Sequence, residues 1–339
     1  MTRASLPAAP VPWASVTAAN ARRAAVVLQC AATLGIVYAV HRWGALGWRW
    51  AAAVALGALV GSYLVSVGWA FAIALTGLGA NGPDEPEWSR MTVPPEQRLG
   101  IGGALSCWLR ECASVAWMFN VLQPFRARAA FVPAAPGAVR VPVLMIHGYG
   151  CNRAVWLPMQ RTLAAAGHPT GAIDLMPLLG DIDHYAGDIA DAVTKMTQRY
   201  GRAPVLLCHS MGGLAARAFL RQVREALPVA QVITLGTPHR GTAMARAGRG
   251  RNVRQMAWGN PWLRELAAAE TQATRAHITS IFSWHDSIVG PPGASWLTGA
   301  RHVPLSGIGH VSLLCDARAR DAVLAELARI DPLGPAFSA

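Results

Sequence analysis

Ser210 stands where a serine side chain could act as a nucleophile. An apolar run that begins at Val205 stops at this serine, and a turn of small residues then leads into a helical pattern. A serine at the apex of a tight strand-to-helix turn projects its oxygen out of the fold, and the helix N-terminus behind it offers unpaired N–H groups to a developing negative charge. Gly212 and Gly213 supply the small residues needed where the two backbones nearly touch. The alternative is an ordinary buried serine at a helix start.

The string His209-Ser-Met-Gly-Gly213 resembles the nucleophile elbow of the α/β-hydrolase superfamily, in the form found in bacterial lipases and esterases. One position departs from the usual G-x-S-x-G, because Cys208 occupies the place of the first glycine. The resemblance covers about residues 141–330 and implies an α/β fold, a mostly parallel sheet flanked by helices. It also implies a catalytic triad in the chain order serine, acid, histidine.

Two later residues fit the remaining places of that triad. His310 lies in a glycine-flanked loop between the last apolar strand and the last helix, which resembles the lipase pattern for the catalytic base. The alternative is a histidine that caps the final helix. Asp286 follows a predicted strand, and its Asp-x-x-Val-x-Pro string resembles the acid loop of the family. The less favoured acids are Asp181, Asp183 and Asp316, and His285 is interpreted as part of the loop structure.

The oxyanion of ester hydrolysis needs backbone N–H donors, which the resemblance assigns to two loops. Met211, directly after the nucleophile, supplies one. The stretch from His147 to Asn152 follows an apolar strand and resembles the His-Gly oxyanion loop of lipases, which makes the Tyr149 amide the second donor. The alternative is a plain glycine turn at a strand end, and His147 is interpreted as a hydrogen-bonding support.

A third string, Thr237-Pro-His-Arg-Gly241, is similar to the Thr-Pro-His-x-Gly stretch of lipases and is expected to shape the pocket wall. Residues 241–275 beyond it lie where lipases carry a lid, so the resemblance implies a lid-like insertion there. Its arginines up to Arg254 follow one another without an intervening acid, and tryptophans come after them. This composition suggests contact with an anionic lipid surface, or else a solvated loop. The basic and aromatic residues in and beside it are Arg240, Arg246, Arg249, Arg251, Arg254, Trp258 and Trp262.

The elements that must position these residues alternate as in a parallel α/β domain. Continuous apolar strands predict burial on both faces of the sheet. Strands are expected at Val143 to Ile146, Ala172 to Leu175, Pro204 to His209, Gln231 to Leu235, His277 to Ser283 and His302 to Ser306. Helices are expected at Arg153 to Ala166, Asp181 to Tyr200, Met211 to Ala226 and Leu313 to Ile330, with an irregular stretch before about Arg275.

The front of the chain carries an apolar excess. Residues 1–23 are interpreted as a disordered lead and 24–80 as a membrane region of two transmembrane helices, from Ala24 to Val40 and from Ala51 to Ala80. About 20 helical residues cross a ~30 Å hydrocarbon core, so the second segment is long enough and the first is marginal. The alternatives are one spanning helix with an interfacial neighbour, a cleaved signal peptide, or a soluble chain. Tryptophans and arginines between the segments suit a membrane interface, and arginine counts slightly favour a cytoplasmic catalytic domain at a bacterial inner membrane.

Residues 81–140 are expected to hold a proline-rich linker and a helix from Ile101 to Leu122, either on the membrane surface or, as favoured, packed on the catalytic domain. The catalytic domain is assigned to residues 141–339. The formal charge of +12 comes almost wholly from arginine. No zinc-ligand spacing, RNA-binding signature or basic recognition helix accompanies it, so an anionic membrane is favoured over nucleic acid as the partner. The six cysteines show no disulfide or metal spacing.

Together these features predict a membrane-anchored serine hydrolase, a lipase or carboxylesterase acting on lipid-like esters without a cofactor or metal. Ser210 is the expected nucleophile, His310 the base and Asp286 the acid, with the Tyr149 and Met211 amides holding the oxyanion. An acyltransferase or thioesterase would use the same triad. A catalytically silent membrane interaction module is a third hypothesis. Oligomeric state, natural substrate and acyl-chain length are not indicated by the sequence.

Overall fold

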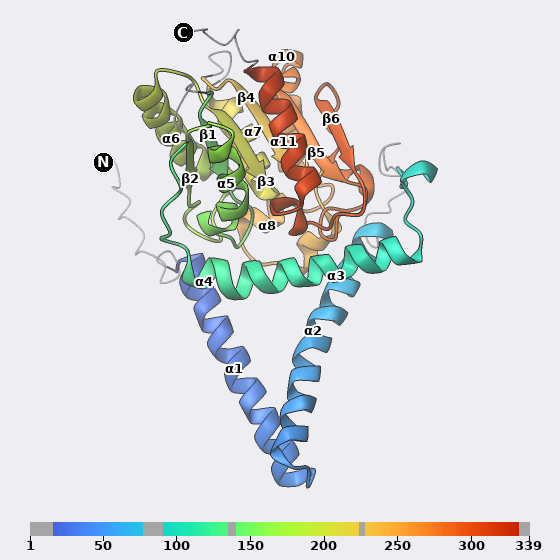
Figure 1. The fold of residues 1–339 in the computed structure, drawn as a ribbon. Coiled ribbons are helices and arrows are strands. Elements are labelled where there is room, and N and C mark those ends of the chain that lie inside the picture. The colour runs from blue at the N-terminus through green and yellow to red at the C-terminus, as the bar shows by residue number, and fades with distance from the viewer. Residues whose placement is uncertain (1–15, 77–90, 135–139, 224–227, 332–339) are drawn as a thin grey trace, which may run out of the picture.

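A computed structural model describes residues 16–76, 91–134, 140–223 and 228–331 of the 339-residue chain. Its centre is a sheet of six parallel strands in the order β2-β1-β3-β4-β5-β6 (Figure 1). The parallel arrangement brings the carboxyl ends of all six strands to one edge of the sheet, where loops can form a site. The strands are β1 Val143–Ile146, β2 Thr170–Ile173, β3 Val205–His209, β4 Gln231–Leu235, β5 Ile278–Ser283 and β6 Arg301–Leu305.

Helices cover both faces of the sheet. One face packs against α6 (Tyr185–Tyr200) and α7 (Met211–Val223), and the other against α5 (Leu157–Ala165) and α11 (Ala317–Ile330). Successive strand residues alternate between two hydrophobic cores, as the pleat requires. All residues of β1, β3 and β5 are buried, which confirms the prediction that continuous apolar strands lie in the middle of a doubly covered sheet.

The predicted strands and helices of this domain are all present, with shifted ends that have local causes. Pro158 stands in the first turn of α5, and residues 153–156 before it form a 3-10 turn instead of the expected α-helix. The last helix begins at Ala317 rather than Leu313, because the Asp316 side chain accepts a 2.9 Å hydrogen bond from the Arg318 N–H and caps it there. The predicted end of the elbow helix, residues 224–226, lies outside the described residues.

The expectation of an irregular stretch before Arg275 was wrong. This part of the chain contains a 3-10 turn, Ala243–Ala247, and the short helices α8 (Arg251–Gln255), α9 (Pro261–Ala268) and α10 (Gln272–Ala276). Polar caps at Thr242, Asn260 and Thr271 start three of these elements. Their apolar side chains enter the first core, where the buried members are Ala245, Val253, Met256, Leu263 and Leu266.

Two long helices, α1 (Ala18–Trp43) and α2 (Trp48–Thr76), extend away from the sheet domain as a V whose tip lies far from it (Figure 1). Both are long and apolar enough to cross a membrane, with mean hydropathies of 1.7 and 1.9, although a signal sequence near the N-terminus has the same properties as α1. Residues 18–23, which the sequence assigned to the lead, are helical because Thr17 caps α1 by accepting a hydrogen bond from the Asn20 N–H. The rest of the lead, residues 1–15, is outside the described residues.

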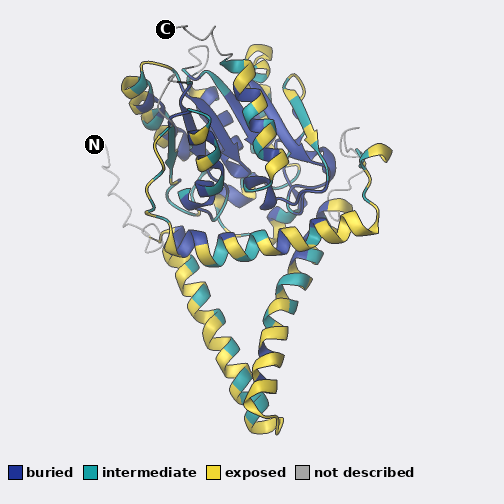
Figure 2. Cartoon of the chain, in the orientation of Figure 1, coloured by how far each residue is buried: buried dark blue, intermediate teal, exposed yellow. Residues whose placement is uncertain are grey.

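Helix α3 (Ile101–Trp117) lies across the open end of the V, between its arms and the sheet domain (Figure 1). It continues through a π-helical turn, Met118–Leu122, into the short helix α4 (Gln123–Phe125). The buried residues Glu111 and Met118 face the sheet domain, which confirms the favoured packing of this helix. Much of its remaining surface is exposed (Figure 2). Of the expected linker, residues 91–98 are described and include a 3-10 turn, Pro95–Gln97.

Candidate active site

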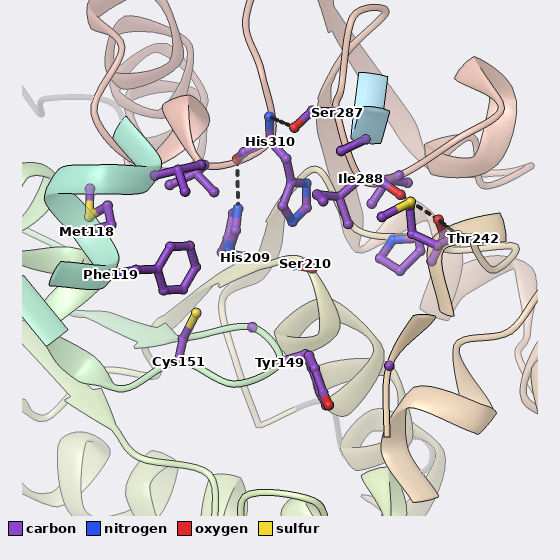
Figure 3. A pocket seen from close by; sticks show the side chains of 18 of the residues that line it. Met118, Phe119, Tyr149, Cys151, His209, Ser210, Thr242, Ser287, Ile288 and His310 are labelled. Carbon is purple, nitrogen blue, oxygen red and sulfur yellow. Dashed lines mark hydrogen bonds between the residues drawn. The ribbon is translucent and has the colours of Figure 1, made fainter. Parts of the chain in front are cut away.

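Ser210 lies at the carboxyl end of β3, in the turn that leads into α7. Its φ of +54° falls in the left-handed region, which a non-glycine residue occupies only when the surrounding structure holds it there. The Ser210 N–H donates to the Leu235 carbonyl at 2.9 Å, and its carbonyl accepts from the Thr237 hydroxyl at 2.9 Å and from the Gly213 N–H at 3.1 Å. The backbone is therefore held on both sides while the side chain faces a pocket (Figure 3).

The turn forms although Cys208 replaces the first glycine of the usual motif. Cys208 is fully buried within β3, between Ile146 of β1 and Thr234 of β4. The close approach occurs instead on the helix side, because a Cβ on Gly212 would lie 2.5 Å from the carbonyl oxygen of Ile146. Position 212 thus requires glycine, whereas position 208 accepts a small buried side chain.

His310 and Asp286 meet at the same edge of the sheet. Asp286 follows β5 and His310 follows β6, and Oδ2 of the aspartate lies 2.9 Å from Nδ1 of the histidine. The other carboxylate oxygen accepts hydrogen bonds from the Ile288 and Val289 N–H groups at 2.8 and 2.7 Å, which fixes the carboxylate plane. Burial lowers the pKa of His310, but the charge and hydrogen bond of Asp286 and the charge of Glu111 raise it, and the result lies above the usual histidine value.

The other carboxylates considered for the triad acid form ion pairs away from His310. Asp181 pairs with Arg251 and Asp183 with Arg221, while Asp316 caps α11 and pairs with Arg318. The two neighbouring histidines are occupied in loop structure, as the sequence suggested. His147 accepts from the Leu175 N–H at 3.0 Å, and His285 accepts from the Gly307 N–H at 3.1 Å.

The two loops expected to hold the oxyanion flank Ser210. Met211 is the first residue of α7, where N–H groups have no carbonyl partner in a preceding turn. Tyr149 lies in the loop after β1, and this loop comes so close that a Cβ on Gly148 would lie 2.8 Å from the Ser210 Cβ. The Tyr149 hydroxyl donates to the Arg249 carbonyl at 2.7 Å, which ties the loop to the segment before α8.

A cavity of about 390 Å³ opens beside Ser210 and His310. Its lining is mainly apolar and comes from the sheet domain and from the N-terminal helices alike. Figure 3 shows Met118 and Phe119 of the π-helical turn on one side of the cavity and Thr242 and Ile288 on the other. Helix α2 contributes Ser66, Val67 and Ala70, and the charged side chains in the lining are Arg22 and Glu111.

His209 and Glu111 contact the base loop, and sequence reasoning assigned neither a role. Nε2 of His209 lies 3.1 Å from the His310 carbonyl oxygen (Figure 3), and burial holds the pKa of His209 well below its usual value. The sequence signal for a role of His209 was its place directly before the proposed nucleophile, Ser210. Glu111 lies about 200 residues before the loop that it contacts, so no local pattern indicates the contact.

The remaining predicted features also have places in the structure. The Thr237 string lies after β4, and Pro238 lines the cavity, as the pocket-wall prediction requires. Arg240 donates to the Trp296 carbonyl at 2.7 Å, whereas the arginines at 246, 249, 251 and 254 are exposed. In the described part of the chain, no group of three or more His, Cys, Asp or Glu side chains could hold a metal ion.

Comparison with known proteins agrees with this architecture. The chain is similar in structure to the lipase BlEst2 of Bacillus licheniformis in its mature form, with a TM-score of 0.52 and 18% identity, over 58% of this chain and 96% of that one. The propeptide form of the same lipase gives a TM-score of 0.51 at 18% identity, over 60% of this chain and 53% of that one. At these identities the likeness shows the fold. The model of the alpha/beta hydrolase family matches residues 143–336, and the chain therefore belongs to the alpha/beta hydrolase family.

Proposed function

We propose that this hydrolase is a membrane-anchored lipase or carboxylesterase, in which Ser210 cleaves carboxylic esters of lipid-like substrates through an acyl-enzyme. The observation that carries the proposal is a single arrangement. Ser210 occupies a strained turn at the end of β3, faces the same cavity as His310, and His310 is hydrogen-bonded to Asp286. These groups match the nucleophile, base and orienting acid that ester hydrolysis requires.

In the first half of the reaction, Oγ of Ser210 attacks the ester carbonyl while Nε2 of His310 accepts its proton. The tetrahedral intermediate then breaks its bond to the alkoxide, which leaves as an alcohol after taking the proton from His310. In the second half, water attacks the acyl-enzyme by the same route and releases the carboxylic acid and free Ser210. Asp286 keeps Nδ1 of His310 in its hydrogen bond, so that Nε2 is the nitrogen that accepts and returns the proton.

We assign the stabilisation of the negative charge on the carbonyl oxygen to the backbone N–H groups of Met211 and Tyr149. The loop of Tyr149 packs against Ser210, and the α7 N-terminus adds its dipole on the other side. Removal of one oxyanion donor costs roughly 100- to 1000-fold in rate in enzymes of this type. The geometry of these two loops is thus expected to matter more than the side chains that they carry.

The cavity supports a substrate with an apolar chain. Volumes of about 300–1,000 Å³ with mainly apolar walls suit small hydrophobic ligands, and the cavity of about 390 Å³ lies in that range. Part of its wall belongs to α2 and to the π-helical turn, so an acyl chain bound there would touch the N-terminal helices. The similarity of the fold to that of the lipase BlEst2 also supports ester substrates of this kind.

Membrane anchoring is supported by the surfaces of the N-terminal helices. Trp43, Trp48 and Trp50 are exposed at the tip of the V, where aromatic rings suit a membrane interface. Helix α3 and the turns after it present exposed apolar side chains four or eight residues apart, as a helix lying on a bilayer would. These side chains are Ile101, Leu105, Leu109, Trp117, Val121 and Phe125. In the proposed layout α1 and α2 span the inner membrane of a bacterium, with the sheet domain slightly favoured on the cytoplasmic side.

The experiment that tests this function measures turnover of p-nitrophenyl esters with short and long acyl chains by the full chain purified in detergent. The Ser210→Ala variant is the control, and its circular dichroism spectrum establishes that it is folded. We expect turnover that favours long chains and falls by several orders of magnitude in Ser210→Ala. Retained activity in a clean preparation of that variant would contradict the assignment of the triad. A preference of the wild-type protein for short chains would indicate an esterase with a narrow pocket.

A further inference from the structure

Glu111 is a buried carboxylate that helix α3 inserts into the hydrolase domain. The residue is 1% exposed, and it precedes the segment that matches the alpha/beta hydrolase family. Its Oε1 accepts hydrogen bonds from the Ser287 hydroxyl at 2.7 Å and from the Val311 N–H at 2.9 Å. Its Oε2 accepts from the Ser312 N–H at 2.9 Å and from the Ser312 hydroxyl at 2.7 Å. Four donors therefore converge on one carboxylate.

These donors belong to the two loops that carry the proposed acid and base. Ser287 follows Asp286, while Val311 and Ser312 follow His310. The Ser287 hydroxyl also accepts a 3.3 Å hydrogen bond from the His310 N–H (Figure 3), so the acid loop, the base loop and Glu111 form one connected network. A group at the centre of this network sets how far the two loops lie from each other.

The base loop is shaped to admit the carboxylate. A Cβ on Gly309, the residue before His310, would collide with Oε2, Cδ and Cγ of Glu111. Only a residue without a side chain therefore lets the loop backbone approach the carboxylate this closely. The burial of an unpaired carboxylate is costly, and hydrogen bonds from neutral donors to a charged acceptor are the means of offsetting that cost.

We propose that Glu111 is a positioning residue for the triad, which holds the loops of Asp286 and His310 in their reactive arrangement from a helix outside the family-matched segment. The proposal rests on the proposed function, since it assigns a role toward that same triad. It follows that the hydrolase domain is complete only with α3 docked on it. Helix α3, which lies between the two N-terminal helices and the sheet domain, then contributes a residue that shapes the active site.

The chemistry of the contacts requires a carboxylate at this position. All four partners are donors, so an amide would direct its own N–H group at one of them, and a shorter acid would reach only part of the network. The charge also acts on the base. His310 faces Asp286, Glu111 and the neutral ring of His209, and the two carboxylates favour the protonated imidazole. Loss of the Glu111 charge should therefore lower the pKa of His310, which a merely structural contact would not do.

The test compares wild type with Glu111→Gln and Glu111→Asp, as full-length proteins in detergent, with a soluble p-nitrophenyl ester as substrate. Glu326→Gln is the matched control, because Glu326 is also a buried carboxylate but contacts Thr279, Arg301 and Arg329 near the amino ends of β5 and β6, at the edge of the sheet opposite the triad. We expect Glu111→Gln to lower kcat by about 10- to 100-fold with KM changed by less than about twofold. The midpoint of the rise of kcat/KM with pH should lie at a lower pH in Glu111→Gln than in wild type. Glu111→Asp should recover part of the lost kcat.

The proposal is overturned if folded Glu111→Gln keeps the wild-type kcat and pH profile, or if it loses no more activity than Glu326→Gln. Should Glu111→Gln fail to fold, Ser312→Ala decides the matter, because it deletes one hydroxyl donor from the network. A kcat lowered several-fold at an unchanged Tm supports the proposal, and an unchanged kcat refutes it. Ser210→Ala distinguishes a failure of the proposed function from a failure of the positioning role. If Ser210→Ala turns over the ester as fast as wild type, the proposed function is contradicted. If Ser210→Ala is inactive but Glu111→Gln keeps the wild-type rate, only the positioning role is contradicted.

Discussion

Oδ2 of Asp286 lies 2.9 Å from Nδ1 of His310, and both side chains are almost fully buried. The contact joins the loops after two neighbouring parallel strands, β5 and β6, whose register brings Ser283 opposite Leu305. It places an anion beside an imidazole where little solvent screens the attraction. The protonated form of His310 is favoured as a result, and the pH dependence of the reaction should report it.

We expect kcat/KM to rise with pH and to reach half of its maximum above about pH 6.5, the usual pKa of histidine. The base must be neutral to accept the proton of Ser210, and the pKa of His310 is raised by Asp286 and Glu111 despite its burial. Asp286→Asn should move the midpoint to lower pH and reduce kcat by roughly 10⁴-fold, as for other triads. A pH series of initial rates measures both, and a wild-type midpoint well below pH 6.5 would contradict the assignment.

Gly212→Ala should destabilise the fold by about 1–3 kcal/mol, the usual range for overpacking. The added Cβ would meet the backbone carbonyl oxygens of Ile146 and His147, which cannot move without distorting β1 and the oxyanion loop. Gly187→Ala is the matched control, because Gly187 is an exposed position of α6 with open space around its Cα. Thermal unfolding should show a lower Tm for Gly212→Ala and an equal or higher Tm for Gly187→Ala. Equal stability of the two variants would mean that the elbow is looser than described.

Much of the sheet and of the site could be predicted from the sequence because the signals are local. Continuous apolar runs gave β1, β3 and β4 within a residue of their observed ends, and the strings around Ser210, Asp286 and His310 identified the three residues that the fold assembles. The edge strand β2 was placed two residues late. Its first residues, Thr170 and Gly171, lack the apolar character that marks the central strands.

What the sequence missed depends on contacts between distant segments. The helices within residues 241–275 are too short for a clear period, and glycines and prolines interrupt them, yet they form because the first core receives their apolar side chains. Glu111 stands in the predicted helix from Ile101 to Leu122, where nothing in the sequence distinguishes it from other polar residues. Its four donors come from residues 287–312, and no spacing rule connects residues so far apart.

Ala70→Trp should reduce turnover of long-chain esters at least tenfold while changing short-chain turnover by less than about threefold. Ala70 is a buried residue of α2 that lines the cavity, so an indole ring there would occupy the space proposed for the distal part of an acyl chain. Ala58→Trp, at an exposed position of the same helix, is the control. The measurement is kcat/KM across p-nitrophenyl esters of increasing length. An equal loss for short and long chains would exclude α2 as part of the acyl-chain site.

Glu270→Ala should lower the free energy of unfolding by about 3–5 kcal/mol, the range for breaking a buried ion pair. The Arg217 side chain is fully buried in α7, and its Nη2 donates to Oε2 of Glu270 at 2.9 Å, while Nη1 donates to the His239 carbonyl at 2.9 Å. Loss of the carboxylate leaves the guanidinium without its buried anion. Glu265→Ala is a suitable comparison, since Glu265 is an exposed acid of the neighbouring α9. Similar unfolding midpoints for the two variants would contradict the prediction.

The full chain should remain in the membrane fraction after washing at alkaline pH, which removes proteins held only at the surface. The reason is the apolar length of the two helices, because α2 can cover the ~30 Å hydrocarbon core without a charged residue and the shorter uncharged part of α1 comes close to that length. Leu56→Arg combined with Val60→Arg introduces two charges into the exposed middle of α2, at roughly 2.5–3.5 kcal/mol each for insertion. This variant should move partly to the supernatant, or be degraded before it accumulates. Recovery of the wild-type chain in the supernatant would refute the anchor, and a double-arginine variant as firmly bound as wild type would place α2 outside the hydrocarbon core.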